Sequence, residues 1–316
     1  MNTNKKKVYR IKKKNFLIFL LFIALFIFGI VEIIFCIGKL ITTSNKKIDE
    51  KKIIVKEKET KDKDNKEKIN SNYKLDQLEN IDKKIDYFNY DYIERYIQYK
   101  DNNKNLDIEQ IIKNVNMNLD KTQYEDRIPA KKLNTEVILV NKYYYLEENY
   151  IPNNLEKINN QYALDNMKLV KTAKEEFERL SKEAAKEGLN IIAMSAYRSY
   201  SYQVDLYNRY AKSDGKEKAD TYSGRAGHSE HQTGLAVDVY NKKLPYTSFE
   251  NTKEYIWMKE NAHKYGFILR FPKDKEEETG YHFESWHYRY VGKDIATYIK
   301  ENNISFEEYY ATKIKD

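Results

Sequence analysis

Residues 229–238, which read Ser-Glu-His-Gln-Thr-Gly-Leu-Ala-Val-Asp, constrain the fold of this chain more than any other segment. The aliphatic side chains that follow Gly234 alternate with small or polar ones, so they predict a strand with Asp238 on the face opposite to the aliphatic residues. An unbroken strand would place His231 on the wrong face to meet Asp238. Gly234 can adopt backbone angles that other residues avoid, so the chain can turn there and bring His231 beside Asp238. A neutral imidazole and a carboxylate that converge on one point suit a zinc ion.

A third zinc ligand is predicted at His287, in the motif Glu-Ser-Trp-His. His231, Asp238 and His287 together supply two imidazoles and one carboxylate, which leaves the fourth zinc position for water, as a catalytic site requires. Glu284 lies three residues before His287 and is predicted to be the base that takes a proton from water and delivers it to a leaving amine. We therefore expect one zinc ion per chain. The chain contains no His-Glu-x-x-His segment, which excludes a zincin.

Arg198 follows a predicted strand at residues 191–194, in the segment Ser-Ala-Tyr-Arg-Ser. An arginine at the end of a strand can bind a carboxylate in a bidentate manner or stabilise an oxyanion, so Arg198 is a candidate catalytic residue. The alternative is an ordinary surface ion pair, which contributes little. His263 and His282 are expected to lie outside the metal site. The predicted substrate contacts are Gln203, Ser223, Arg225, His228 and Trp286.

The N-terminal residues have the composition of a membrane anchor. Residues 1–15 carry seven basic side chains, and residues 16–38 are apolar apart from Glu32, which is long enough to span a bilayer with the N-terminus in the cytoplasm. A cleaved signal peptide, with its shorter apolar region, fits less well. Residues 39–74 are rich in charged side chains and predict a flexible stalk. We therefore expect a single-pass protein of the cell membrane with its catalytic domain on the extracellular face.

The remaining residues divide into a helical lead-in at 75–130 and a domain at 131–316. Helices and strands mix there without a regular alternation, which indicates the α+β class. The only cysteine lies in the apolar N-terminal run, so no disulfide can stabilise the domain and its core must do so. Strands are predicted at 137–140, 191–194, 235–239, 267–271 and 286–291, and helices at 91–100, 107–116 (with Asp107 as its cap), 163–187, from Ser199 or Ser201 to 210, from Ser248 to 265, and 294–302.

Three motifs resemble those of the VanY-type zinc D-alanyl-D-alanine carboxypeptidases, which trim the terminal D-alanine from cell-wall stem peptides. The motifs are Ser-Ala-Tyr-Arg-Ser at 195–199, the segment at 229–238, and Glu-Ser-Trp-His-Tyr-Arg-Tyr-Val-Gly at 284–292, and the resemblance covers about residues 133–300. It implies an antiparallel sheet with flanking helices, shared with hedgehog-type domains, and a stem peptide ending in D-alanine as substrate. It also implies zinc on His231, Asp238 and His287, Glu284 as base, and Arg198 on the oxyanion or carboxylate of the substrate.

Two departures from the family concern the frame of the site. Many relatives have Ala-Arg-Pro-Gly where this chain has Gly-Arg-Ala-Gly at 224–227, and proline often stands at the position of Ser285. Neither departure removes a ligand. The loss of proline is expected to loosen the loop that frames the substrate, so it affects specificity more than catalysis.

Three alternatives to this function differ in what they require. A serine peptidase of the penicillin-binding type needs Ser-x-x-Lys with two further motifs, which the three Ser-x-x-Lys segments here lack. A non-catalytic, zinc-containing cell-wall-binding module would have no need of Glu284, since structural zinc prefers four protein ligands. The alternative of an L,D-carboxypeptidase acting on tetrapeptides stays open.

The net charge of +7 comes with no nucleic-acid-binding motif, so no nucleic acid is expected as a partner.

Overall fold

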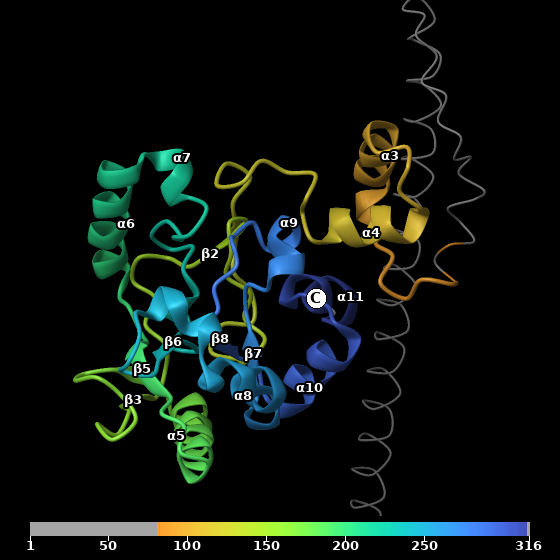
Figure 1. Cartoon of the computed structure of the whole chain (residues 1–316). Coiled ribbons are helices and arrows are strands. Elements are labelled where there is room, and N and C mark those ends of the chain that lie inside the picture. The colour runs from red at the N-terminus through yellow and green to blue at the C-terminus, as the bar shows by residue number, and fades with distance from the viewer. Residues whose placement is uncertain (1–80, 82, 315–316) are drawn as a thin grey trace, which may run out of the picture. The chain divides into compact units, whose positions relative to one another are not determined.

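The computed structural model describes residue 81 and residues 83–314 of the chain (Figure 1). The predicted tail at 1–15, membrane anchor at 16–38 and stalk at 39–74 lie outside these residues, as does the start of the predicted lead-in. Among the residues that the structure describes, no helix is both long enough and apolar enough to cross a bilayer.

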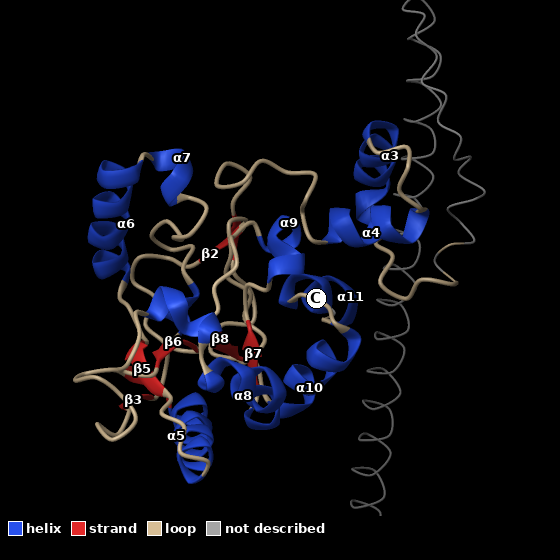
Figure 2. Ribbon diagram, in the orientation of Figure 1, coloured by secondary structure: helices blue, strands red, loops and turns tan. Residues whose placement is uncertain are grey.

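One antiparallel sheet with the strand order β5-β6-β8-β7 lies at the centre of the domain (Figure 2). Its strands are β5 (Ile192–Ser195), β6 (Ala236–Tyr240), β7 (Phe267–Leu269) and β8 (His287–Tyr290). Each of them overlaps a strand predicted from the sequence, and the predicted antiparallel sheet with flanking helices is confirmed. Val237 and Val239 belong to the main hydrophobic core, which leaves Asp238 between them for the opposite face.

Helix α5 (Lys171–Lys186) covers the aliphatic face of this sheet. Its buried stripe includes Ala173 and Phe177, and the Phe177 ring lies 6.0 Å from that of Phe267 on β7. The predicted start of this helix at residue 163 is wrong. Lys168–Val170 instead forms strand β4, which pairs antiparallel with β3 (Leu155–Lys157). The hydrogen bonds between these two strands satisfy the backbone N–H and C=O groups that a helix would otherwise have paired. Gly188, with φ of +74°, ends the helical segment.

Two other predictions are wrong for reasons that the hydrogen bonds explain. Residues 138–140 are buried but form no strand, because the guanidinium of Arg289 donates to the carbonyl oxygen of Ile138 and replaces a strand partner. Ser248 does not cap a helix. Thr252 does, since its hydroxyl accepts a hydrogen bond from the backbone N–H of Tyr255 and begins α8 (Lys253–Asn261).

The lead-in contains two helices that were predicted, α3 (Ile93–Asn102) and α4 (Ile108–Asn116). Asp107 caps α4 through the backbone N–H of Gln110, as predicted. Helix α11 (Phe306–Lys313) was not predicted, and its Glu308 forms an ion pair of 3.1 Å with Lys113 on α4. The remaining elements are η1 (Tyr90–Tyr92), β1 (Ile128–Pro129), β2 (Tyr144–Tyr145), α6 (Tyr200–Asp214), α7 (Lys216–Ala219), η2 (Glu230–Thr233), η3 (Tyr246–Asn251), η4 (Ala262–Tyr265), η5 (Lys273–Lys275), α9 (Glu276–Thr279) and α10 (Lys293–Asn302).

Candidate active site

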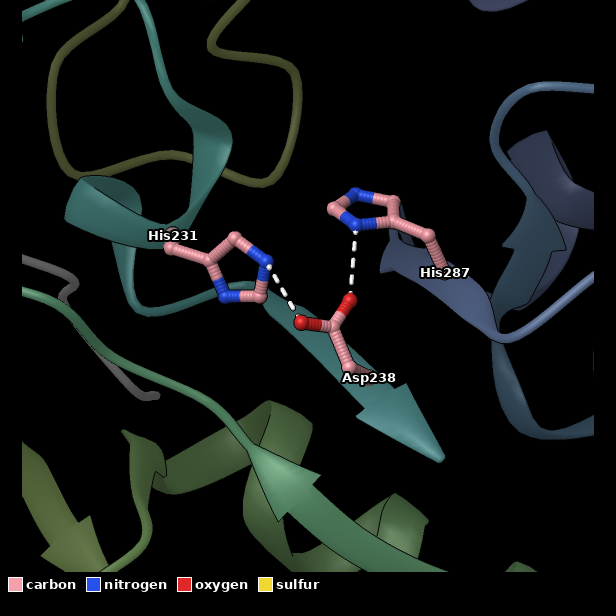
Figure 3. A group of neighbouring side chains, drawn as sticks. All are labelled: His231, Asp238 and His287. Atoms are coloured by element: carbon pink, nitrogen blue, oxygen red, sulfur yellow. Dashed lines mark hydrogen bonds and ion pairs between the residues drawn. The ribbon is translucent and has the colours of Figure 1, made fainter. Parts of the chain in front are cut away.

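The register of the central sheet brings two predicted zinc ligands together. Asp238 on β6 lies directly opposite His287 at the start of β8. His231 comes from the short helix η2, and the chain then reverses at Gly234, whose φ is +67°. This turn confirms the local geometry predicted from the sequence. Figure 3 shows the three side chains converging on one point.

The distances within this group fit a zinc ion. Nε2 of His231 lies 3.3 Å from Oδ2 of Asp238, and Nδ1 of His287 lies 3.0 Å from Oδ1 (Figure 3). One ligand atom from each residue lies within 4.8 Å of the others, and all three residues are buried. Zinc bonds of about 2.0–2.2 Å in tetrahedral geometry place ligand atoms roughly 3.3 Å apart, so modest movement would complete the site. Nδ1 of His231 lies 2.6 Å from the carbonyl oxygen of Ala196, which leaves Nε2 free to bind metal.

The charges around the group favour a cation. Burial lowers the pKa of His231 to about 4, so this ligand is neutral at pH 7. Burial disfavours the charge of Asp238, yet His231 and Arg198 outweigh it and hold the pKa of Asp238 well below its usual range. For His287, burial lowers the pKa, but the carboxylates of Asp238 and Glu230 outweigh this effect and raise it to about 9. A metal ion bound here would therefore displace a proton from His287.

Glu284 lies beside the group as a buried carboxyl. Its Oε2 is 3.7 Å from Nδ1 of His287. Burial raises the pKa of Glu284 to about 8, and the charge of Asp238 adds to the effect while His287 and Arg198 oppose it. A carboxyl whose pKa lies near the working pH can both accept and return a proton, which is what a general base and acid must do.

Arg198 reaches the same group from the segment after β5. One terminal nitrogen of its guanidinium donates to Oδ2 of Asp238 at 2.6 Å, and Nε donates to Ser195 Oγ at 3.0 Å. Its side chain is about one-fifth exposed, at 19%. The second terminal nitrogen lies 3.5 Å from Oε1 of Gln203, a distance at which a hydrogen bond is weak. Arg198 therefore lies beside the metal group with one donor edge only weakly engaged.

Three of the five predicted substrate contacts hold the loop before the metal segment. Gln203 donates to the carbonyl oxygen of Gly224 at 2.8 Å, and lies 3.5 Å from the hydroxyl of Ser223. Arg225 forms a bidentate ion pair with Asp220. These contacts tie the segment before the metal ligands to α6 and to the turn that follows α7.

The last two predicted contacts, His228 and Trp286, are rings that pack against neighbouring tyrosines. His228 is buried with Nδ1 at 2.8 Å from the carbonyl oxygen of Asn141. The partly buried Trp286 packs edge-to-face on Tyr246, with the ring centroids 5.0 Å apart. The substrate-binding roles of all five residues stay predictions.

Sequence reasoning did not identify several residues that surround the site. Glu230 is buried behind His287 and binds both Arg270 and Arg289. A signal for the arginines existed, because each lies in an otherwise apolar or aromatic strand segment and arginine is almost never fully buried unless it is paired. Burial and, to a smaller extent, the nearby charge of Asp238 raise the pKa of Tyr246 on η3. No sequence pattern indicated that Tyr246 lies near the site.

Comparisons with known proteins agree on one family. A family model described as VanY, D-alanyl-D-alanine carboxypeptidase, matches residues 166–293. A D-alanyl-D-alanine carboxypeptidase of Enterococcus faecium is 35% identical over 199 residues, which cover 60% of this chain and 61% of that protein. The bifunctional D-Ala-D-Ala dipeptidase and carboxypeptidase VanXYC of Enterococcus gallinarum is 32% identical over 177 residues, covering 54% of this chain and 92% of that protein.

A solved structure of the LdcB LD-carboxypeptidase has a similar fold. It matches with a TM-score of 0.57 and 34% identity, covering 62% of this chain and 94% of that one. The described domain therefore has a mixed fold of helices and strands like that of this peptidase. The chain spans less than two thirds of the length of the Enterococcus faecium relative.

Proposed function

Because the chain belongs to the VanY family of D-alanyl-D-alanine carboxypeptidases, we propose that it is a zinc metallopeptidase that removes the terminal D-alanine from peptidoglycan stem peptides. The observation that carries this proposal is the position of Glu284. It adds a buried carboxyl with a raised pKa to a group of two histidines and one aspartate. A purely structural zinc site needs no such base and prefers four protein ligands.

His231, Asp238 and His287 would hold the zinc ion, one per chain. Zinc in such a site supplies Lewis acidity, which polarises a carbonyl group and lowers the pKa of water to about 7. Glu284 takes one proton from the attacking water while the oxygen of that water bonds to the scissile carbonyl carbon. The same carboxyl returns the proton to the nitrogen of the departing D-alanine as the C–N bond breaks. Arg198 stabilises the negative charge that develops on the carbonyl oxygen.

Replacement Glu284→Gln tests this assignment, since it keeps the shape of the side chain and removes its basicity. The full-length variant is expected to bind zinc as the natural chain does and to release D-alanine roughly 10²–10⁴-fold more slowly. Glu254→Gln is the matched control, because Glu254 is also buried but contacts Asn190 and Asn241 on another part of the domain. Undiminished release by Glu284→Gln would refute the proposed mechanism. Zinc binding without release from any peptide by the natural chain would instead support a non-catalytic wall-binding module.

A second candidate function is L,D-carboxypeptidase activity on tetrapeptides, which the similarity to LdcB favours. The two activities differ in the residue that precedes the terminal D-alanine. Pentapeptide and tetrapeptide muropeptides should be offered side by side, with released D-alanine measured. The D,D proposal expects release from the pentapeptide at least ten times faster, and the reverse order would establish the L,D activity in its place.

We also propose that residues 16–38 anchor the protein in the cell membrane, with its N-terminus in the cytoplasm and its catalytic domain on the extracellular face. The support is the apolar composition of this segment and the basic side chains before it. Extraction of membranes at alkaline pH should leave the full-length chain in the membrane fraction, and protease added to intact cells without a wall should digest the domain. Release of the chain by alkaline extraction would refute the anchor.

A further inference from the structure

Two buried polar atoms behind the metal group face each other without a hydrogen bond. Nε2 of His287 lies 3.6 Å from Oε2 of Glu230, which is too long for a hydrogen bond. Among the described residues neither atom has another hydrogen-bond partner, although both side chains are buried. A buried polar atom without a hydrogen-bond partner loses its hydration without compensation, so this pair calls for an explanation.

Glu230 is held in place through its other oxygen. Oε1 accepts hydrogen bonds from Nε of Arg270 and from a terminal nitrogen of Arg289, both at 2.9 Å. Arg270 also donates twice to Glu307 on α11, at 2.6 and 2.8 Å. Arg289 donates further to the carbonyl oxygen of Ile138 at 2.7 Å. Two carboxylates and two guanidiniums are thus buried together, and they fix Glu230 so that Oε2 points to His287.

The tautomer of His287 determines whether it can bind metal. Its Nδ1 faces Asp238 and the proposed zinc position. A neutral imidazole carries one proton, so Nδ1 can offer its lone pair to a metal only when Nε2 carries that proton. A protonated Nε2 then needs an acceptor, and Oε2 of Glu230 is the nearest carboxylate oxygen on that side.

We propose that Glu230 is a positioning residue for the metal site. It accepts a hydrogen bond from Nε2–H of His287 and thereby selects the tautomer that presents Nδ1 to zinc, while Arg270 and Arg289 clamp it. This inference rests on the proposed function, because it needs His287 to be a zinc ligand. Partners of this kind beyond the direct ligands typically change metal affinity by roughly 10–100-fold.

The substitution Glu230→Gln tests the role because it reverses the polarity of the atom that faces His287. If the amide oxygen keeps the contacts with the arginines, the amide N–H₂ group faces Nε2 and favours the unprotonated nitrogen. Glu307→Gln is the matched control. Glu307 is equally buried and bonds the same Arg270, but no contact joins it to His287 among the described residues.

Zinc affinity of the full-length chain should be measured by competition with a chelator of known affinity. We expect Glu230→Gln to bind zinc roughly 10–100-fold more weakly, and Glu307→Gln to change the affinity by less than about threefold even where it lowers the unfolding midpoint. Equal weakening by both variants would show a merely structural network, and unchanged affinity of Glu230→Gln would also overturn the inference. If the natural chain itself binds no zinc, it is the proposed function that fails.

A second measurement needs no substitution. The ¹⁵N chemical shifts of the histidines in the zinc-loaded natural chain should show Nε2 of His287 protonated and Nδ1 bound to metal. An unprotonated or metal-bound Nε2 would overturn the role of Glu230 regardless of how the variants fold.

Discussion

Substituting Gly234 by alanine should damage both the stability of the domain and its metal site. Gly234 has φ of +67° and joins the helix that carries His231 to the strand that carries Asp238. A Cβ atom at this position would lie 2.8 Å from Cδ2 of Leu155 and 3.1 Å from Cγ2 of Val170. The backbone carbonyl of Gly234 also accepts a hydrogen bond of 2.8 Å from the N–H of Val170, so the turn cannot move away freely.

The expected cost has two parts. An alanine held in the left-handed backbone region costs roughly 1–2 kcal/mol, and forcing an extra methyl group into a packed core costs about 1–3 kcal/mol more. Gly234→Ala should therefore lower the free energy of unfolding by roughly 2–5 kcal/mol. Gly188 is the matched control, because its φ is +74° but a methyl group added there would have no atom within 4 Å. Gly188→Ala should cost only the first part, about 1–2 kcal/mol.

Urea denaturation of both full-length variants, with zinc affinity measured in parallel, separates the two parts. We expect Gly234→Ala to be less stable than Gly188→Ala by about 1–3 kcal/mol and to bind zinc more weakly, while Gly188→Ala binds zinc normally. Equal stabilities of the two variants, together with equal zinc affinities, would refute the claim that close packing around Gly234 sets the position of His231.

Three further predictions concern other parts of the domain. Arg198→Lys should lower kcat for D-alanine release by roughly 10²–10³-fold at unchanged zinc content. The single ammonium group of lysine cannot donate to Asp238 and to the carbonyl oxygen of the substrate at the same time, as a guanidinium can, and an unchanged kcat would contradict this role. Lys142→Met should stabilise the protein at pH 7 by up to about 3 kcal/mol, since burial lowers the pKa of Lys142 to about 8. Below pH 8 Lys142 is charged in both the folded and the unfolded protein, so the gain in the free energy of unfolding should be complete there. It should vanish as the pH rises toward 10.5, the ordinary pKa of lysine, and a gain that denaturation measurements find independent of pH would contradict the prediction. Thr252→Ala should cost about 1 kcal/mol in the same assay through loss of a helix cap, and Thr252→Ser much less.

The sequence predicted the metal group because its geometry depends on short-range features. Gly234 permits the turn that brings His231 to Asp238, and alternation along β6 separates Asp238 from the core. The pairing of Asp238 with His287 depends on the register between two strands that are distant in the sequence. No local pattern indicated this register, and His287 was predicted only because a second histidine suits a zinc site.

The failures of prediction arose where long-range partners replaced local preference. Lys168–Val170 continues a helical pattern in the sequence, but pairing with β3 makes it a strand. Residues 138–140 lack a strand partner because Arg289 supplies the hydrogen bond from 151 residues away along the chain. Glu230 was missed for the same reason, since its partners come from β8 and the segment after β7. Spacing within one segment does not reveal contacts of this kind.

Zinc content and D-alanine release, measured on one preparation of the full-length chain, test the proposed activity most directly. We expect one zinc ion per chain, loss of D-alanine release when a chelator removes the metal, and recovery when one equivalent of zinc is added back. Fewer than half an equivalent of zinc in a preparation that releases D-alanine at full rate, or release that continues after complete metal removal, would contradict the assignment of His231, Asp238 and His287 as the ligands of a catalytic zinc ion.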